Sequence, residues 1–328
     1  MGYIRSRALP LLDFFSTPDA ILRQEASHQE PFGWFFEEVQ RLPQFMAQDK
    51  DAHPRRRVLL VRGGTLSQHS GLGGAFHDLR TSLESEQISG WESAGIEEYN
   101  LAEGASGLRR LLKRWFGHPK QVLQTIRRLH KTDSVDLIHV ADQEQAHLIP
   151  KRSPAPVVVY VHDFFHLFPE VISLNGERIE VGEQQPPWYR RSDLKRLMKG
   201  IGRANGIICN TRATEALCRK HFPNTPLYRI PYGLDTAKFA PTFPLPAAPS
   251  GLSSTTCNLL VVGSHAPRKR LKFLIRTLSK LPEELLQSLM IHHIGGDSCP
   301  YGGVAASEYA TQHGVPWTHV GGEISDDV

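Results

Sequence analysis

Short apolar runs alternate along the chain with longer stretches whose apolar residues recur at helical spacing. The apolar runs lie at residues 58–62, 135–140, 157–161, 206–209 and 227–230. Helix candidates lie between them at residues 75–83, 108–130, 189–203 and 212–221. Continuous apolar runs are typical of strands that are buried on both faces of a sheet. This alternation therefore predicts an α/β fold built on a doubly wound parallel sheet.

One segment breaks the alternation. Residues 171–181 have the sequence VISLNGERIEV, in which two β-prone runs flank Asn175-Gly176. Asn-Gly is the strongest short signal for a two-residue hairpin turn. We therefore expect a β-hairpin inserted after the strand that ends at His162.

A second series of elements follows a stretch rich in Pro, Ala, Ser and Gly, which is typical of an interdomain linker. Beyond this stretch we expect a strand at 258–262, a helix at 268–281 and strands at 289–294 and 317–320. A complete Rossmann-like unit usually has five or six strands, so the second unit is predicted to be incomplete.

These elements divide the chain into four predicted parts. They are an N-terminal extension at 1–54, a first Rossmann-like domain at 55–230, a linker at 231–256 and a partial second Rossmann-like domain at 257–328. The predicted fold class is α/β, with two Rossmann-like doubly wound domains of which the second is incomplete.

Composition and charge exclude several classes of protein. The chain of 328 residues is 40% hydrophobic and 22% charged, as globular proteins are. Its formal net charge of +4 is too small to indicate a nucleic-acid-binding surface. The four cysteines form no C-x-x-C pair, and no apolar run approaches the roughly 18 residues of a membrane span. Because the start also lacks the apolar core of a signal peptide, we expect a cytoplasmic protein.

Two groups of residues in the first domain have the pattern of a ligand site. Gly71-Leu72-Gly73-Gly74 is expected in a loop before the first helix, where glycines let backbone N–H groups approach a phosphate. The alternative is a simple tight turn.

His162-Asp163 follows the strand at 157–161, at the sheet edge where ligands of open α/β folds bind. His162 can contact a sugar hydroxyl with Asp163 orienting its ring; alternatively, both residues only cap the strand.

A third group, Gly263 to Arg270, follows the first strand of the second unit and contains Arg268 and Lys269. Cations at the start of a helix conflict with the helix dipole, which favours anions. The conflict predicts a bound polyanion such as a diphosphate; the alternative is a solvated basic turn.

No metal site is expected. His162 and His166 have no third ligand nearby in the sequence. Asp49-Lys50-Asp51 imitates a metal-binding D-x-D motif but follows no strand, so we interpret it as a solvated charge run.

Five segments, in order along the chain, resemble the motifs of the retaining enzymes called glycosyltransferase family 4. The first three are Ser70–Gly74, similar to a G-G-x-G loop, His162-Asp163, similar to an H-D strand end, and Ile208–Thr211, similar to a strand before a helix. The last two are Arg229–Pro241, similar to I-P-N-G-V-D-x3-F-x-P, and Val262–Lys269, similar to V-G-S-x-x-P-R-K. The resemblance runs from residue 58 to the end of the chain.

The resemblance implies a GT-B fold, with an acceptor-side domain first, a donor domain second and a cleft between them. It implies a hexosyltransferase that moves a sugar from a nucleotide-sugar donor to a glycan or lipid-linked acceptor with retention, as in polysaccharide biosynthesis. No cofactor and no metal would be needed beside the donor substrate. The implied catalytic residues are His162, Arg268 and Lys269. The implied donor and phosphate contacts are Gly71, Gly73, Gly74, Arg268, Lys269 and Gly296.

Departures from the family pattern leave alternatives open. Tyr232 stands where Asn is common, and Ser264 stands where many members carry Arg. The later E-x7-E motif of the family is absent, because no two of the glutamates after the linker are eight residues apart. One alternative is a C-terminally truncated, catalytically inactive relative that acts as a binding or interaction protein. Another is a nucleotide-sugar epimerase of the same fold.

The stretch from Leu108 to Lys131 is basic and amphipathic, with the aromatic pair Trp115-Phe116. Such helices can lie on anionic membranes, where lipid-linked acceptors are found. The alternative is a Rossmann helix with one buried face and one solvated basic face. The expected location is therefore the cytoplasm, either free or peripheral at the inner face of the membrane.

Overall fold

The computed structural model describes residues 55–63, 71–98, 107–132, 134–174, 177–233, 256–299 and 303–321. Its largest sheet consists of six parallel strands in the order β2-β1-β3-β4-β7-β8. These strands are β1 (Arg56–Val61), β2 (Trp91–Glu97), β3 (Leu137–Val140), β4 (Val157–Val161), β7 (Gly206–Cys209) and β8 (Leu227–Arg229). Each apolar run predicted in this half is confirmed as a strand, within two residues at either end.

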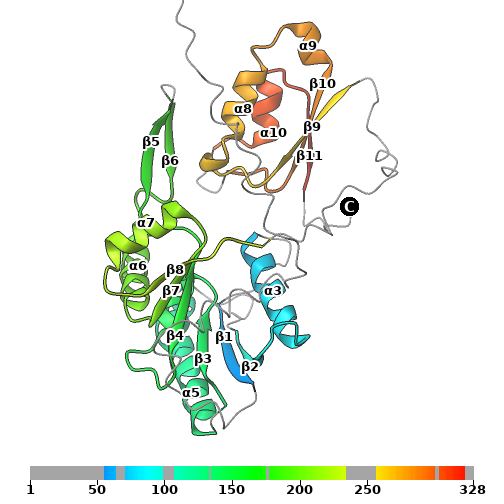
Figure 1. The fold of residues 1–328 in the computed structure, drawn as a ribbon. Coiled ribbons are helices and arrows are strands. Elements are labelled where there is room, and N and C mark those ends of the chain that lie inside the picture. The colour runs from blue at the N-terminus through cyan, green and yellow to red at the C-terminus, as the bar shows by residue number, and fades with distance from the viewer. Residues whose placement is uncertain are drawn as a thin grey trace, which may run out of the picture.

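Helices cover both faces of this sheet (Figure 1). One core joins alternate strand residues such as Leu59 and Ile207 to α5 (His118–Lys131), α6 (Trp188–Ile201) and α7 (Arg212–His221). The other core joins the intervening strand residues, such as Leu60, to Phe76 and Leu79 of α3 (Gly71–Glu84). Because side chains on both faces of strands such as β4 and β7 are buried, these strands have unbroken apolar sequences.

The strand order reverses between β1 and β3. From β1 the chain passes to β2 on one side and then crosses back to β3 on the other. Loops that leave the carboxyl ends of two such strands diverge to opposite faces of the sheet and open a crevice there. The expected position of a ligand is therefore the edge at which α3, the end of β3 and the end of β4 meet.

The helix predicted at 108–130 consists of three parts. They are α4 (Gly107–Leu112), the π-helical turn η1 (Lys113–Gly117) and α5. In α5, Val122 and Ile126 are buried, so this part is the expected Rossmann helix with one apolar face. By contrast, α4 and η1 bury none of their residues.

The predicted hairpin is present as β5 (Glu170–Leu174) and β6 (Glu177–Val181), which pair antiparallel with Ile172 opposite Ile179. The Asn175-Gly176 turn itself lies outside the described residues. The 3-10 helix η2 (Gln143–Leu148), which sequence patterns did not predict, follows β3 and packs against α6.

A second sheet contains three parallel strands in the order β11-β10-β9. They are β9 (Cys257–Val262), β10 (Leu289–Ile294) and β11 (Trp317–Val320), as the sequence predicted. Helices α8 (Leu271–Leu278) and α10 (Ala306–Gln312) pack on this sheet through Ile275, Ile291 and Ala310, and α9 (Glu283–Gln287) precedes β10 (Figure 1). Leu260 and Val262 of β9 are 65% and 67% exposed, so this sheet is not covered as evenly as the first.

Two predicted boundaries are wrong. Gly71, Gly73 and Gly74 lie in the first turn of α3 and not in the loop before it. The helix predicted at 268–281 is broken: η3 (Pro267–Lys269) is a 3-10 turn, and α8 begins at Leu271. Between them Arg270 has a left-handed backbone, with φ of 60°, which no continuous right-handed helix accommodates.

No helix among the described residues has both the length and the apolar character needed to cross a membrane.

Candidate active site

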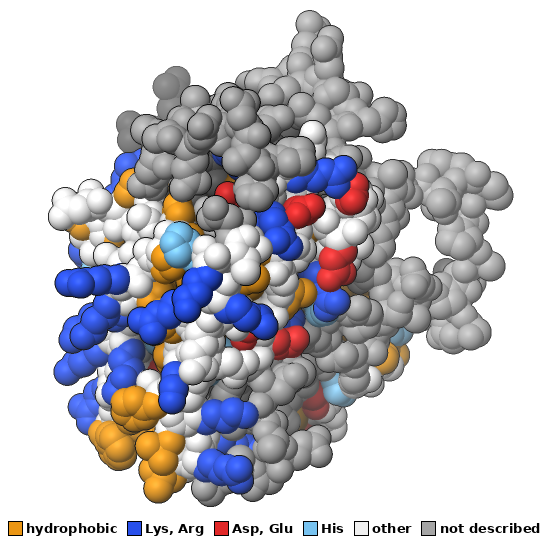
Figure 2. Space-filling model, turned by 90° about the horizontal axis from the view of Figure 1, so that it is seen from below, with side chains coloured by type: hydrophobic (Ala, Val, Ile, Leu, Met, Phe, Trp, Pro, Cys, Tyr) orange, Lys and Arg blue, Asp and Glu red, His pale blue; other side chains and the backbone are white. Residues whose placement is uncertain are grey.

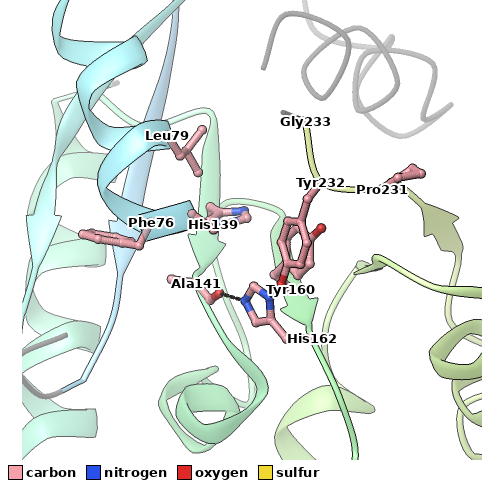
Figure 3. A pocket seen from close by; sticks show the side chains of 10 residues that line it. Phe76, Leu79, His139, Ala141, Tyr160, His162, Pro231, Tyr232 and Gly233 are labelled. Atoms are coloured by element: carbon pink, nitrogen blue, oxygen red, sulfur yellow. Dashed lines mark hydrogen bonds between the residues drawn. The ribbon is translucent and has the colours of Figure 1, made fainter. Parts of the chain in front are cut away.

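A pocket lies at the carboxyl edge of the six-stranded sheet, at the crevice that the strand order predicts (Figure 3). It encloses about 460 Å³, including the part open to solvent. One wall comes from α3, the floor from the ends of β3 and β4, and the far wall from the segment after β8. The lining residues are Ala75, Phe76, Leu79, His139, Ala141, Tyr160, His162, Pro231, Tyr232 and Gly233.

His162 follows β4 directly, and both of its ring nitrogens are engaged. Nε2 lies 2.9 Å from the carbonyl oxygen of Ala141, at the end of β3. Because a carbonyl only accepts, Nε2 carries the proton and Nδ1 carries the lone pair. The hydroxyl of Tyr232 donates to Nδ1. The ring is therefore held in one tautomer, with its acceptor nitrogen turned to the segment after β8.

The pocket keeps His162 uncharged. Burial lowers the pKa of His162 to about 4, and it lowers the pKa of the neighbouring His139 to about 3. At neutral pH both imidazoles are neutral. His162 can accept a hydrogen bond from a hydroxyl, but it cannot supply positive charge to a leaving group.

Two aromatic rings, those of Tyr160 and Tyr232, stack beside this histidine. Tyr160 lies 4.3 Å from the ring of His162 and 6.0 Å from the ring of Tyr232, between centroids, with interplanar angles of 16° and 3°. The hydroxyl of Tyr160 donates to the carbonyl oxygen of Ile230 at 3.0 Å. This bond fixes the chain where it leaves β8, and so it places Tyr232 against His162.

The expectation that Asp163 orients His162 is wrong. Asp163 accepts a hydrogen bond from the backbone N–H of Phe165 at 3.3 Å, which makes a local turn after the strand. The backbone N–H of His162 instead donates to Oε1 of Gln143, at 3.0 Å. Successive side chains at a strand end point to opposite sides, so a sequence neighbour is poorly placed to hold the ring.

The glycine segment lies one turn from the pocket. Gly71, Gly73 and Gly74 form the first turn of α3, and the next residues, Ala75 and Phe76, line the cavity. The N–H groups of a first helical turn have no partner within the helix and can receive an anion. A methyl group added at Gly71 would meet nothing within 4 Å, so the described fold does not itself require glycine at this position.

Arg268 links the second sheet to the segment after β4. Both Arg268 and Lys269 are exposed in η3, and the guanidinium carbon of Arg268 lies 5.2 Å from the ring centroid of Phe165. Phe165 is three residues beyond His162. The predicted diphosphate-binding turn therefore contacts the same short segment as the predicted sugar-contacting histidine.

Gly296 lies beside the turn after β9. A Cβ atom at this position would be 3.8 Å from the side chain of Ser264. The preceding Gly295 has a φ of 133° and packs so tightly on the backbone of Gly263 that a Cβ would come within 2.3 Å of its carbonyl oxygen. The loops after β9 and β10 thus meet through glycine contacts.

Sequence patterns missed an acidic group near this edge. Asp142, which follows β3, is 2% exposed, and its Oδ1 has no hydrogen-bond partner among the described residues. Burial, reinforced by the charge of Glu144, raises the pKa of Asp142 to about 7. A single Asp after an apolar run is too common a pattern to single out this group.

Comparisons with known proteins identify a related family and a shared fold. The family model Glycosyltransferase Family 4 matches residues 88–238, which contain His162 and Tyr232. Among solved structures, sucrose-phosphate synthase from Thermosynechococcus elongatus has a TM-score of 0.53 at 16% identity, covering 83% of this chain and 72% of that chain. The N-terminal domain of trehalose-6-phosphate phosphatase from Candida albicans has a TM-score of 0.51 at 12% identity, covering 85% of this chain and 75% of that chain. Comparison with curated protein sequences finds no match.

Proposed function

We propose that this chain, whose residues 88–238 match the family model Glycosyltransferase Family 4 and which has the GT-B fold that its motifs predicted, transfers a hexosyl unit from a nucleotide-sugar donor. The acceptor is a glycan or a lipid-linked glycan, as in polysaccharide biosynthesis, and the transfer retains the anomeric configuration. No cofactor takes part in the proposed reaction.

One observation carries the proposal. The guanidinium of Arg268, in η3, lies over the ring of Phe165, which is three residues after His162. The basic turn that follows β9 therefore reaches the carboxyl edge of the six-stranded sheet. The leaving group of such a transfer is a nucleoside diphosphate, whose developing negative charge must be neutralised. Arg and Lys side chains do this through charge-assisted hydrogen bonds. Arg268 and Lys269 take that role here, and the first turn of α3 is a second anion-binding element of the proposed site.

His162 has a different role from the two cations. Its ring is neutral, and its Nδ1 lone pair already accepts a hydroxyl from Tyr232. A sugar hydroxyl can replace the Tyr232 hydroxyl at the same nitrogen without any change of protonation. We therefore assign His162 to positioning the transferred sugar.

The first prediction concerns binding of the leaving group. Calorimetric titration of the full chain with UDP and with GDP should give saturable binding for one of them. Arg268→Ala and Lys269→Ala should each weaken that binding by about 10- to 100-fold, since each removes one charged hydrogen-bond donor. Lys280→Ala is the matched control, because Lys280 is an exposed cation just beyond α8 and should leave the affinity unchanged.

Other outcomes distinguish the alternatives. Absence of heat with either nucleotide would favour the inactive, interaction-type relative. If a nucleotide binds, incubation with nucleotide-sugar donors should place sugar on a saccharide acceptor, detected by mass spectrometry. A donor that changes its sugar configuration without any transfer would instead identify an epimerase.

We further propose that the acceptor is reached at an anionic membrane surface. Leu108, Leu112, Phe116 and Trp188 are between 51% and 68% exposed, and Arg109, Arg110 and Lys113 are interleaved with them. The rings of Trp115 and Trp188 lie 6.4 Å apart, so α4, η1 and the start of α6 form one surface. Figure 2 shows one face of the molecule, on the described part of which Lys and Arg side chains are more frequent than acidic ones and hydrophobic side chains gather at one edge.

A vesicle experiment tests this surface. The protein should float with vesicles that contain anionic lipid and should be released by salt, because exposed apolar and basic side chains act together. The double variant Leu108→Ser/Leu112→Ser should reduce the bound fraction about tenfold. Leu260→Ser/Val262→Ser removes equally exposed apolar side chains from β9 and should bind as the unaltered protein does. Equal losses in both double variants would show that this surface has no special role.

A further inference from the structure

Three potential metal ligands converge at the carboxyl edge of the second sheet. His293 lies in β10, His319 lies opposite it in β11, and Asp297 follows the Gly295-Gly296 turn after β10 (Figure 1). One ring nitrogen of each histidine and one carboxylate oxygen of Asp297 lie within 4.8 Å of one another. The two imidazole centroids are 5.3 Å apart. This group is separate from the pocket at the edge of the six-stranded sheet.

Hydrogen bonds to neighbouring groups orient each of the three side chains. Nε2 of His293 donates to the carbonyl oxygen of Gly263, and Nε2 of His319 donates to that of Gly295, both at 2.7 Å. The backbone N–H of Ser307 donates to Oδ1 of Asp297 at 2.9 Å, and the Ser307 hydroxyl donates to Oδ2. Metal-binding histidines characteristically donate their other ring N–H to a carbonyl or carboxylate, which leaves the remaining lone pair for the ion.

The burial of His293 and a ring nitrogen left unpaired within the described part of the chain are independent evidence that this group binds a ligand. Its side chain is fully buried, and Nδ1 has no hydrogen-bond partner among the described residues. The nearest carboxylate atom, Oδ1 of Asp297, lies 3.9 Å from Nδ1, too far for a hydrogen bond. Buried polar atoms are normally paired, so an acceptor nitrogen left open and facing a carboxylate requires an explanation.

We propose that His293, Asp297 and His319 bind one divalent transition-metal ion of the Zn²⁺ class. Two imidazole nitrogens and one carboxylate oxygen are donors that suit Zn²⁺, whereas Mg²⁺ and Ca²⁺ prefer all-oxygen sites. Ligand atoms of a tetrahedral Zn²⁺ ion are about 3.4 Å apart, so the separations within the group shorten by up to about 1.4 Å when the ion binds. Three protein ligands leave one coordination position open. The site does not depend on the proposed transfer reaction.

Direct titration tests the site. The full chain without an affinity tag is first treated with a chelator and then titrated with Zn²⁺ against a competing chromophoric chelator. One ion should bind per chain, and Co²⁺ in its place should give the strong visible absorption of a tetrahedral complex. Mg²⁺ and Ca²⁺ should not compete. Failure of the unaltered chain to bind one equivalent of Zn²⁺ or Co²⁺ would overturn the proposal.

Matched variants assign the ligands. Asp297→Asn and His319→Gln should each reduce Zn²⁺ affinity about 100-fold or more and abolish the Co²⁺ absorption. Neither side chain is fully buried, so both variants should keep the fold, which circular dichroism can check. His292→Gln is the control: it is the strand neighbour of His293, but Nε2 and Nδ1 of His292 are already bonded to Asn258 and Thr318. Unchanged binding in Asp297→Asn and His319→Gln would also overturn the proposal.

Discussion

The free energy of unfolding should fall steeply as the pH is lowered from about 6.5 towards 4. Burial lowers the pKa of four histidines in the first half of the chain, to about 4 for two of them and about 3 for the others. These histidines are His118, His139, His147 and His162. In the unfolded chain each would titrate at its ordinary value of 6.5.

The sign follows from proton binding. A group whose pKa is lower in the native state takes up its proton first in the unfolded state, so acid favours unfolding. Asp142 opposes this effect, because its pKa is raised to about 7 and the native state holds its proton before the unfolded state does. At pH 5 the unfolded chain therefore binds about four more protons at these four histidines and about one fewer at Asp142. A net difference of three protons gives a slope of about 4 kcal/mol per pH unit.

Urea unfolding measured across this pH range checks the prediction. His147→Leu should reduce the slope by about 1.4 kcal/mol per pH unit, because it removes one buried ring whose pKa is lowered mainly by burial. His130→Leu is the control, since His130 is exposed on α5, and it should leave the slope unchanged. A slope in the unaltered protein below 1 kcal/mol per pH unit would show that these rings are hydrated.

Most of the fold follows from the sequence because its strands are buried on both faces. Runs such as the one at 157–161 contain no polar residue and end at a turn, so their position is clear. Strand β2 could not be found in this way. It lies at the edge of the sheet, where β1 is its one partner among the described strands, and it contains Glu92, Ser93 and Gly95. Helix α10 was missed for a related reason, because only Ala306 and Ala310 are buried and small residues give little periodicity.

The candidate site was only partly predictable. His162 was found because it follows a strand, and sheet edges are where ligands bind. The hydrogen bond to Tyr232 joins residues 70 positions apart, and no local pattern reveals it. The glycines at 71–74 suggested a loop because glycine weakens helices, yet packing of Phe76 and Leu79 extends α3 through them. The assignments of Arg268, Lys269 and Gly296 to a donor remain predictions.

The surface proposed to contact membranes rests on a buried ion pair. Nε of Arg114, in η1, donates to both carboxylate oxygens of Asp193, in α6, at 3.0 Å each. The Asp193 side chain is only 6% exposed, and it also accepts from the indole N–H of Trp115 and from Arg190. Although burial alone would raise the pKa of Asp193, the hydrogen bonds and charge of Arg114 hold it below its usual value. Since η1 buries no side chain of its own, this carboxylate is a principal anchor of η1 on α6.

Asp193→Asn should therefore lower the free energy of unfolding by about 3–5 kcal/mol at pH 7, the range measured when one partner of a buried pair is removed. The amide keeps the shape of the carboxylate but leaves Arg114 and Arg190 without their shared negative charge. Glu84→Gln is the matched control: it breaks an ion pair with Arg80 in which both side chains are at least 40% exposed, and it should cost less than about 0.5 kcal/mol. Urea unfolding of both variants measures the difference. If Asp193→Asn proves as mild as Glu84→Gln, water already screens the pair, and η1 must be held on α6 by the contacts of Trp115 instead.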